Sequence, residues 1–124
     1  MLRKLTLVLA TAAMLATAGR AGAQGTGPNG GMLGGTGSHK VELVVGPSEL
    51  TVYMTENGKT HDAKGVSLRA VIQQAGKTTT INFADQGGKK LVARLEAPLA
   101  QGAVVVVSGK DDHGDSVQAR YVIK

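Results

Sequence analysis

Apolar and polar positions alternate with a period of two along most of the chain from His39 onward. This alternation is typical of β-strands that bury one face and leave the other in water. Many of the apolar positions are β-branched, as strands prefer. The runs that predict strands cover residues 41–45, 50–54, 66–72, 81–83, 91–95, 104–107 and 117–123.

Turn-forming residues separate these runs. Asn57-Gly58 is the strongest signal, because this pair favours the tight turn of a β-hairpin. The other expected turns are at Gly46-Pro47, Gly76, Gly87-Gly88, Pro98 with Gly102, and His113-Gly114. About seven short strands at this spacing predict an all-β fold. We expect an immunoglobulin-like antiparallel β-sandwich over residues 39–124, with a small β-barrel as the alternative.

Residues 1–23 have the pattern of a secretory signal peptide. Residues 1–4 carry positive charge, residues 5–19 form an uncharged apolar run, and residues 21–23 are a small-residue cleavage site. The apolar run is shorter than the roughly 20 residues that a spanning helix needs. We therefore expect cleavage between Ala23 and Gln24, a periplasmic or secreted mature chain, and no stable membrane insertion after cleavage.

Residues 24–38 form a glycine-rich segment between the signal peptide and the first long strand. Seven of its fifteen residues are glycine. Glycine loses more conformational entropy on ordering than any other residue, and this segment has little apolar surface to bury. We expect most of the segment to be a flexible arm, with Met32 and Leu33 packing against the domain.

Charge and cysteine content narrow the function classes. The chain has 14 Lys+Arg and 9 Asp+Glu, but Arg3, Lys4 and Arg20 belong to the signal peptide. The mature chain therefore has 11 basic and 9 acidic residues, a net charge of +2. This balance, with few aromatic residues, argues against a nucleic-acid partner. The chain has no cysteine, so stability must come from burial and hydrogen bonding without disulfides.

Motifs for catalysis are missing from the sequence. Gly-Lys-Thr occurs at residues 58–60 and 76–78, but a phosphate-binding P-loop needs a glycine five residues before Gly-Lys. Tyr53 and Val71 occupy those positions, so both copies are expected to be hairpin turns. No G-x-S-x-G nucleophile motif is present either. We expect a protein that is not an enzyme.

The histidines are the most informative polar residues. If consecutive strands alternate in direction, all of them fall at one end of the sandwich, together with the acidic loop 111–115 and with Glu56, Asp62 and Asp85. Imidazoles combined with carboxylates suit zinc, copper or nickel, so a transition-metal ion is the candidate cofactor. The candidate metal ligands are His39, His61, His113, Asp111, Asp112 and Asp115.

Two observations favour the alternative of no metal site. Asp and Gly are preferred turn residues, so residues 111–115 also fit a solvated hairpin tip. Lysines at the same end of the predicted sandwich oppose cation binding: Lys40, Lys59, Lys64, Lys89, Lys90 and Lys110.

The segment Gly27-Pro28-Asn29-Gly30-Gly31-Met32-Leu33, followed by residues 41–45 and then Asn57-Gly58-Lys59, resembles a known family. It is similar to the small periplasmic β-domain near the N-terminus of adaptor (membrane-fusion) subunits of heavy-metal efflux systems. The resemblance covers residues 27–60 and implies an accessory role near metal efflux. Histidine is frequent within this glycine segment of the family, and here Asn29 takes that place. This departure weakens the expectation that the domain binds metal itself.

Two function hypotheses result from the sequence. In the first, the chain is a non-enzymatic periplasmic binding or accessory protein linked to copper- or zinc-type metal handling. In the second, it is an interaction module that docks on a periplasmic protein partner through a sheet face or an edge strand and has no metal site. In that case the glycine-rich arm orders on the partner.

Overall fold

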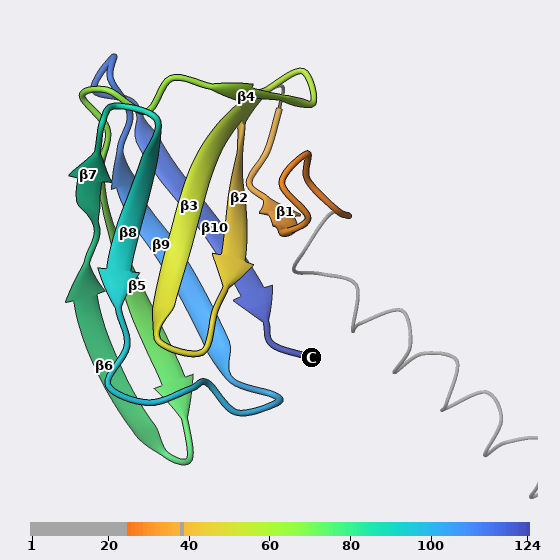
Figure 1. Cartoon of the computed structure of the whole chain (residues 1–124), viewed down its shortest axis with the longest axis vertical. Coiled ribbons are helices and arrows are strands. Elements are labelled where there is room, and N and C mark those ends of the chain that lie inside the picture. Colours follow the sequence, from red (N-terminus) through yellow and green to blue (C-terminus); the bar gives the residue numbers. More distant parts are fainter. Residues whose placement is uncertain (1–24, 38) are drawn as a thin grey trace, which may run out of the picture.

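The computed structural model describes residues 25–37 and 39–124 (Figure 1). The expected signal peptide, residues 1–23, lies outside the described residues. The described part of the chain forms ten β-strands and no helix. It therefore contains no helix with the length and apolar character needed to span a membrane.

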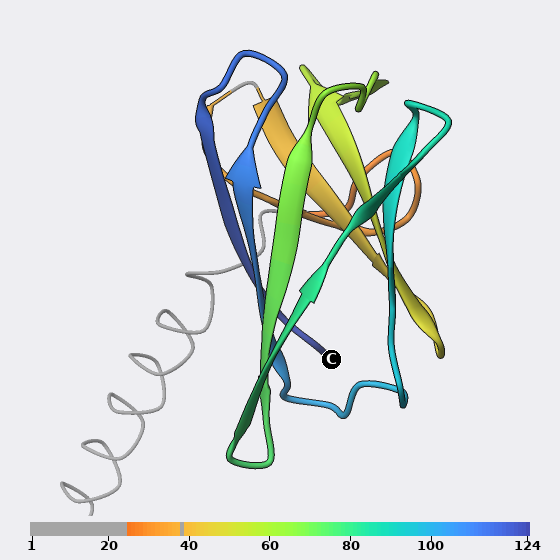
Figure 2. The same ribbon diagram turned by 90° about the vertical axis from the view of Figure 1, so that its left-hand side faces the viewer.

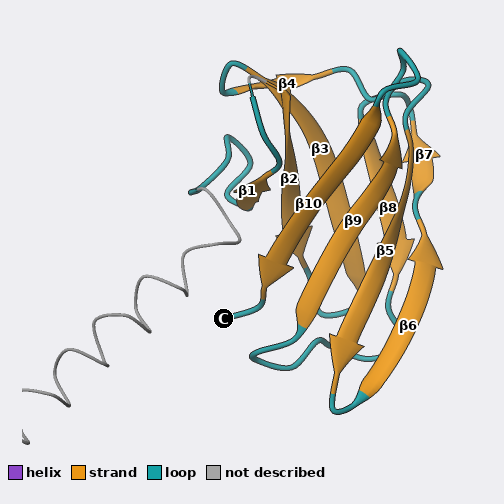
Figure 3. Ribbon diagram, turned by 180° about the vertical axis from the view of Figure 1, so that it is seen from behind, coloured by secondary structure: helices purple, strands orange, loops and turns teal. Residues whose placement is uncertain are grey.

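The strands form two antiparallel sheets that face each other (Figure 2). The six-stranded sheet has the order β1-β2-β3-β8-β7, and β4 also pairs with β3. The four-stranded sheet, which is nearest the viewer in Figure 3, has the order β10-β9-β5-β6. The strands are β1 (Met32–Gly34), β2 (His39–Val45), β3 (Glu49–Glu56), β4 (Lys59–His61), β5 (Ser67–Gln74), β6 (Lys77–Asn82), β7 (Ala84–Gln86), β8 (Lys90–Arg94), β9 (Val104–Lys110) and β10 (Ser116–Val122).

The two separate sheets confirm the predicted all-β sandwich, and the alternative of a closed barrel is wrong. The seven expected strands correspond to β2, β3, β5, β6, β8, β9 and β10. The three strands that the pattern did not predict are β1, β4 and β7, each with three residues. Three residues are too few to show an alternating pattern, so these strands are identified only by their pairing with longer neighbours.

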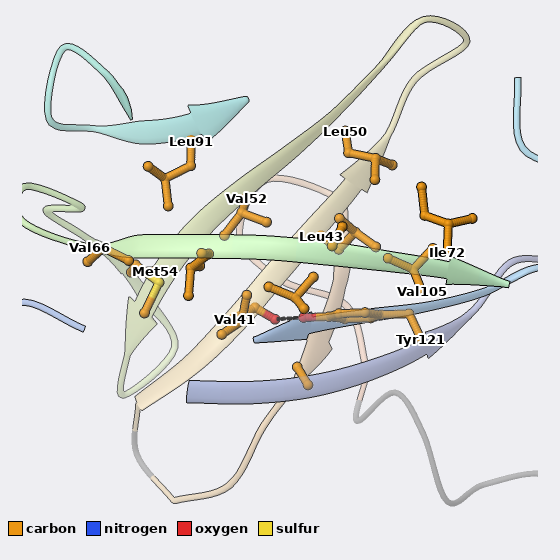
Figure 4. Packing of buried hydrophobic residues seen from close by; sticks show 14 of the residues in the cluster. Val41, Leu43, Leu50, Val52, Met54, Val66, Ile72, Leu91, Val105 and Tyr121 are labelled. Atoms are coloured by element: carbon orange, nitrogen blue, oxygen red, sulfur yellow. Dashed lines mark hydrogen bonds between the residues drawn. The ribbon is translucent and has the colours of Figure 1, made fainter. Parts of the chain in front are cut away.

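The hydrophobic core lies between the sheets and is built from alternate residues of the long strands (Figure 4). In β3, the apolar side chains of Leu50, Val52 and Met54 point inward, as their period predicts. The continuous apolar run of β9 also alternates, because Val105 and Val107 are fully buried and their neighbours are half-buried. The other buried hydrophobic residues of the long strands are Val41, Leu43, Leu68, Ala70, Ile72, Leu91, Ala93, Ala119 and Tyr121.

Tyr121 links the two sheets through its hydroxyl group. The side chain is fully buried, and the hydroxyl donates a 2.6 Å hydrogen bond to the carbonyl oxygen of Val41 in the opposite sheet (Figure 4). Burial, and then the negative charge of Glu42, raise the pKa of Tyr121 well above its usual range. The hydroxyl therefore stays protonated and serves as a permanent donor at the centre of the core.

Glu42 of β2 is fully buried, although its side chain points away from the core. Its carboxylate accepts hydrogen bonds from the backbone N–H of Asn29 at 2.8 Å, from the side-chain amide of Asn29 at 3.0 Å, and from the backbone N–H of Gly31 at 2.7 Å. The same Asn29 amide donates to the Thr60 hydroxyl in β4 at 2.9 Å. A Cβ atom at Gly27 would collide with the Glu42 carboxyl group, so the loop approaches this closely only because residue 27 is glycine.

Residues 25–37, the described part of the glycine-rich segment, lie against the domain, whereas the sequence predicted a mostly flexible arm at residues 24–38. Residues 27–31 cover Glu42, and β1 adds to the edge of β2 with Leu33 opposite Glu42. The expectation that Met32 and Leu33 pack against the domain agrees with this arrangement. Composition alone predicted a flexible segment. It does not show that the buried carboxylate of Glu42 accepts hydrogen bonds from two backbone N–H groups of this loop.

Replacing Tyr121 by Phe removes the hydroxyl group and its hydrogen bond to the Val41 carbonyl oxygen. Because an intramolecular hydrogen bond contributes about 0.5–1.5 kcal/mol net, we expect the free energy of unfolding to fall by that amount. Urea unfolding of the mature chain followed by circular dichroism measures the change. Tyr53→Phe, at a half-buried position on β3, is the matched control and should change stability by less than about 0.5 kcal/mol.

Replacing Glu42 by Gln keeps the shape of the side chain but exchanges one acceptor oxygen for a donor amide. Since hydrogen bonds to charged groups contribute about 1.5–3 kcal/mol, we expect a loss of stability in that range. We also expect faster hydrogen exchange at the Gly31 amide, measured by NMR. Glu49→Gln makes the same chemical change at an exposed residue of β3. If both variants lost equal stability, the proposed role of the Glu42 carboxylate would be wrong.

Candidate functional site

Alternating strand direction brings the start of β2, the end of β4 and the β9–β10 loop, which carry the three histidines, to one end of the sandwich. Strand β4 lies at this end, at the top of Figure 1. His39 is the first residue of β2, and His61 is the last residue of β4. His113 lies in the loop between β9 and β10. The short β4 strand is held at this end by its pairing with the last residues of β3, in which Met54 lies opposite His61.

These side chains line one pocket of about 360 Å³, which we call the histidine pocket. All three histidines line it, and so do Met54 and Val66, which belong to the core cluster drawn in Figure 4. Its lining residues in the described part of the chain include no lysine or arginine. Five carboxylates line it: Glu56, Asp62, Asp111, Asp112 and Asp115. The structure thus brings together all six predicted ligand residues, while Asp85 is not among the lining residues.

Glu56 lies between two of the imidazoles. His39 Nε2 is 3.4 Å from Glu56 Oε1, and His61 Nε2 is 3.7 Å from Glu56 Oε2. Strand pairing explains the first contact, because His39 of β2 is directly opposite Glu56 of β3. Glu56 was placed at this end of the sandwich by the sequence but was not among the predicted ligands. The register of the β2–β3 hairpin is the signal that identifies it.

The imidazole of His61 has a defined orientation. Its Nδ1 atom lies 2.8 Å from the carbonyl oxygen of Asp62. A carbonyl oxygen only accepts hydrogen bonds, so Nδ1 carries the hydrogen and donates it. The Nε2 atom is then the ring nitrogen that faces Glu56, whose Oε2 lies 3.7 Å away. Metal-binding histidines commonly have this outer hydrogen bond to a carbonyl group.

The acidic loop has a different internal organisation. Oδ1 of Asp111 accepts the backbone N–H groups of His113 and Asp115, each at 2.9 Å. The hydrogen bond from Asp115 is the largest of the causes that hold the pKa of Asp111 below its usual value. His113 contacts its neighbour, with Nε2 at 3.7 Å from Asp112 Oδ1. Asp111 therefore shapes the loop, as expected for a hairpin tip.

In the described part of the chain, no group of three or more His, Cys, Asp or Glu side chains is already placed to hold a metal ion. Around Glu56 the donor atoms do not share one point, because the two imidazoles contact different oxygens of the carboxylate. The side chains of His39, His61 and Glu56 are 66%, 44% and 40% exposed, so their rotamers are not locked by packing. Side-chain rotation is required before these donors converge on one point.

The two Gly-Lys-Thr sequences lie at hairpin turns, as predicted, with each glycine in the turn and the Lys and Thr at the start of β4 or β6. Gly58 and Gly76 have φ angles of 81° and 74°, and the preceding Asn57 and Ala75 also have positive φ. Positive φ at both central residues is the backbone conformation of a tight hairpin turn.

A scan of the chain against protein-family models finds no match, and searches of curated proteins and of solved structures find none either.

Replacing Asp111 by Ala removes the acceptor that orders the acidic loop. A carboxyl group whose pKa is lowered on folding stabilises the fold above its unfolded pKa of about 4, and this stabilisation disappears as pH falls through the lower folded value. We therefore expect Asp111→Ala to be less stable than the wild type at pH 7, and the difference to shrink below pH ~4. Thermal unfolding across this pH range measures it. Asp112→Ala is the control in the same loop, and an equal pH-dependent loss there would contradict the assignment.

Proposed function

We propose that the chain is a non-enzymatic periplasmic binding or accessory protein that binds a transition-metal ion in the histidine pocket. One observation carries the proposal: three imidazoles and five carboxylates line a single pocket that has no lysine or arginine among its lining residues. Such an arrangement of charge attracts a cation, and imidazole with carboxylate is a donor set that zinc, copper and nickel accept.

The lysines at this end of the sandwich argue against cation binding, but their positions weaken this argument. Lys59 and Lys110 are exposed ends of β4 and β9, and neither lines the pocket. None of the six lysines at this end lines the pocket, so the charged side chains that an entering ion meets there are carboxylates and imidazoles.

The resemblance of residues 27–60 to the efflux-adaptor domain supports the same setting. It implies a periplasmic protein near heavy-metal transport, and the expected signal peptide at residues 1–23 implies export. Sequence motifs for nucleophilic or phosphate chemistry are missing, which supports a binding role over a catalytic one.

Native mass spectrometry of residues 24–124, which include every described strand, tests this function. Cu(II), Zn(II), Ni(II) and Cu(I) are offered one at a time in the presence of a weak chelator. We expect a single ion bound per chain that survives the competition. Scattered adducts without a defined stoichiometry would reject metal binding and favour the protein-interaction hypothesis.

A further inference from the structure

The strand register places four potential donor side chains on one face at the upper end of the six-stranded sheet. His39 is opposite Glu56, and His61 is opposite Met54. Residues directly opposite in an antiparallel pair, and residues two apart in one strand, project from the same face. All four therefore point into the histidine pocket, and all four line it.

The distances around Glu56 resemble those between ligands of one metal ion. In a tetrahedral site with metal–nitrogen and metal–oxygen bonds of ~2.0–2.2 Å, neighbouring donor atoms are ~3.3–3.6 Å apart. The two imidazole nitrogens are 3.4 and 3.7 Å from the Glu56 oxygens. Rotation of the exposed carboxylate and imidazole side chains brings these donors to one ion between the rings.

The contact of His61 with Asp62 determines which ring nitrogen is available to an ion at this point. Because Nδ1 contacts the Asp62 carbonyl oxygen, Nε2 is the ring nitrogen that faces the Glu56 carboxylate. Lys59, the register partner of Glu56 in β4, is exposed and does not line the pocket, so it leaves this position open.

We propose that His39, Glu56 and His61 bind one divalent transition-metal ion, with Asp62 orienting His61 through its carbonyl group. This inference rests on the proposed function and specifies its ligands. It removes His113 from the predicted ligand set, because His113 is 77% exposed and its imidazole contacts the neighbouring Asp112. It also removes Asp111, whose Oδ1 already accepts two backbone donors. A donor set of two imidazoles and one carboxylate binds Cu(II) more tightly than Zn(II) in the usual order of divalent ions.

Isothermal titration of residues 24–124 with Cu(II) and with Zn(II) tests the ligand set. We expect one ion per chain, with His61→Ala and Glu56→Gln each weakening binding at least tenfold. His113→Ala distinguishes this ligand set from one that uses all three imidazoles of the pocket, and it should change the affinity less than threefold. Circular dichroism of each variant verifies that the domain is folded.

Electron paramagnetic resonance of the Cu(II)-loaded chain gives a second readout that does not depend on affinity. We expect hyperfine coupling to two imidazole nitrogens in the wild type and to one in His61→Ala. If the wild type binds one ion but only His113→Ala weakens it, the ligand set is wrong and the proposed function stands. If the wild type binds no ion in defined stoichiometry, the proposed function itself is overturned.

Discussion

The Glu42 carboxylate lies where water does not reach it, and the groups that satisfy it come from a loop that precedes β2 in the chain. An ionised group in such a place is tolerated only when hydrogen bonds replace its hydration. The loop at residues 27–31 supplies them, and by doing so it positions β1 on the edge of the six-stranded sheet. Asn29 extends the effect to β4 through its contact with Thr60.

This chain of contacts connects the glycine-rich segment with the histidine pocket. β4 has only three residues, all exposed, and a strand this short has little burial of its own to stabilise it. It is held by pairing with β3 on one side and by the Asn29 amide on its outer face. His61 is the last residue of β4, so the orientation of its imidazole depends indirectly on the buried carboxylate of Glu42.

The alternating pattern predicted the long strands, their inward residues and the two-sheet architecture. It could do so because a strand in a sandwich buries every second side chain, which produces a period of two in the sequence. It also predicted that the histidines meet, since an alternating strand direction determines at which end each loop lies. The short strands and the ordered glycine segment were not predictable in this way. Their order comes from hydrogen bonds between distant residues, such as Asn29 with Glu42, which no local pattern shows.

The candidate site also combines features that the sequence predicted with features that it did not. The alternation of strand directions placed Glu56 at the correct end of the sandwich. Its position between two imidazoles, however, depends on the register of the β2–β3 hairpin. The Nδ1 contact of His61 depends on a backbone carbonyl, which every residue has, so residue identity gives no signal for it.

Asn29 occupies the position where the resembling family often has histidine, and the structure shows which groups a residue at that position contacts. Asn29 contacts Glu42 and Thr60 on the outer face of the sheet, whereas the histidine pocket opens at the end of the inner face. A ligand at position 29 and the ligands proposed here would therefore belong to different places in the fold. The presence of Asn29 removes a donor from the outer face and leaves the donor set of His39, Glu56 and His61 unchanged.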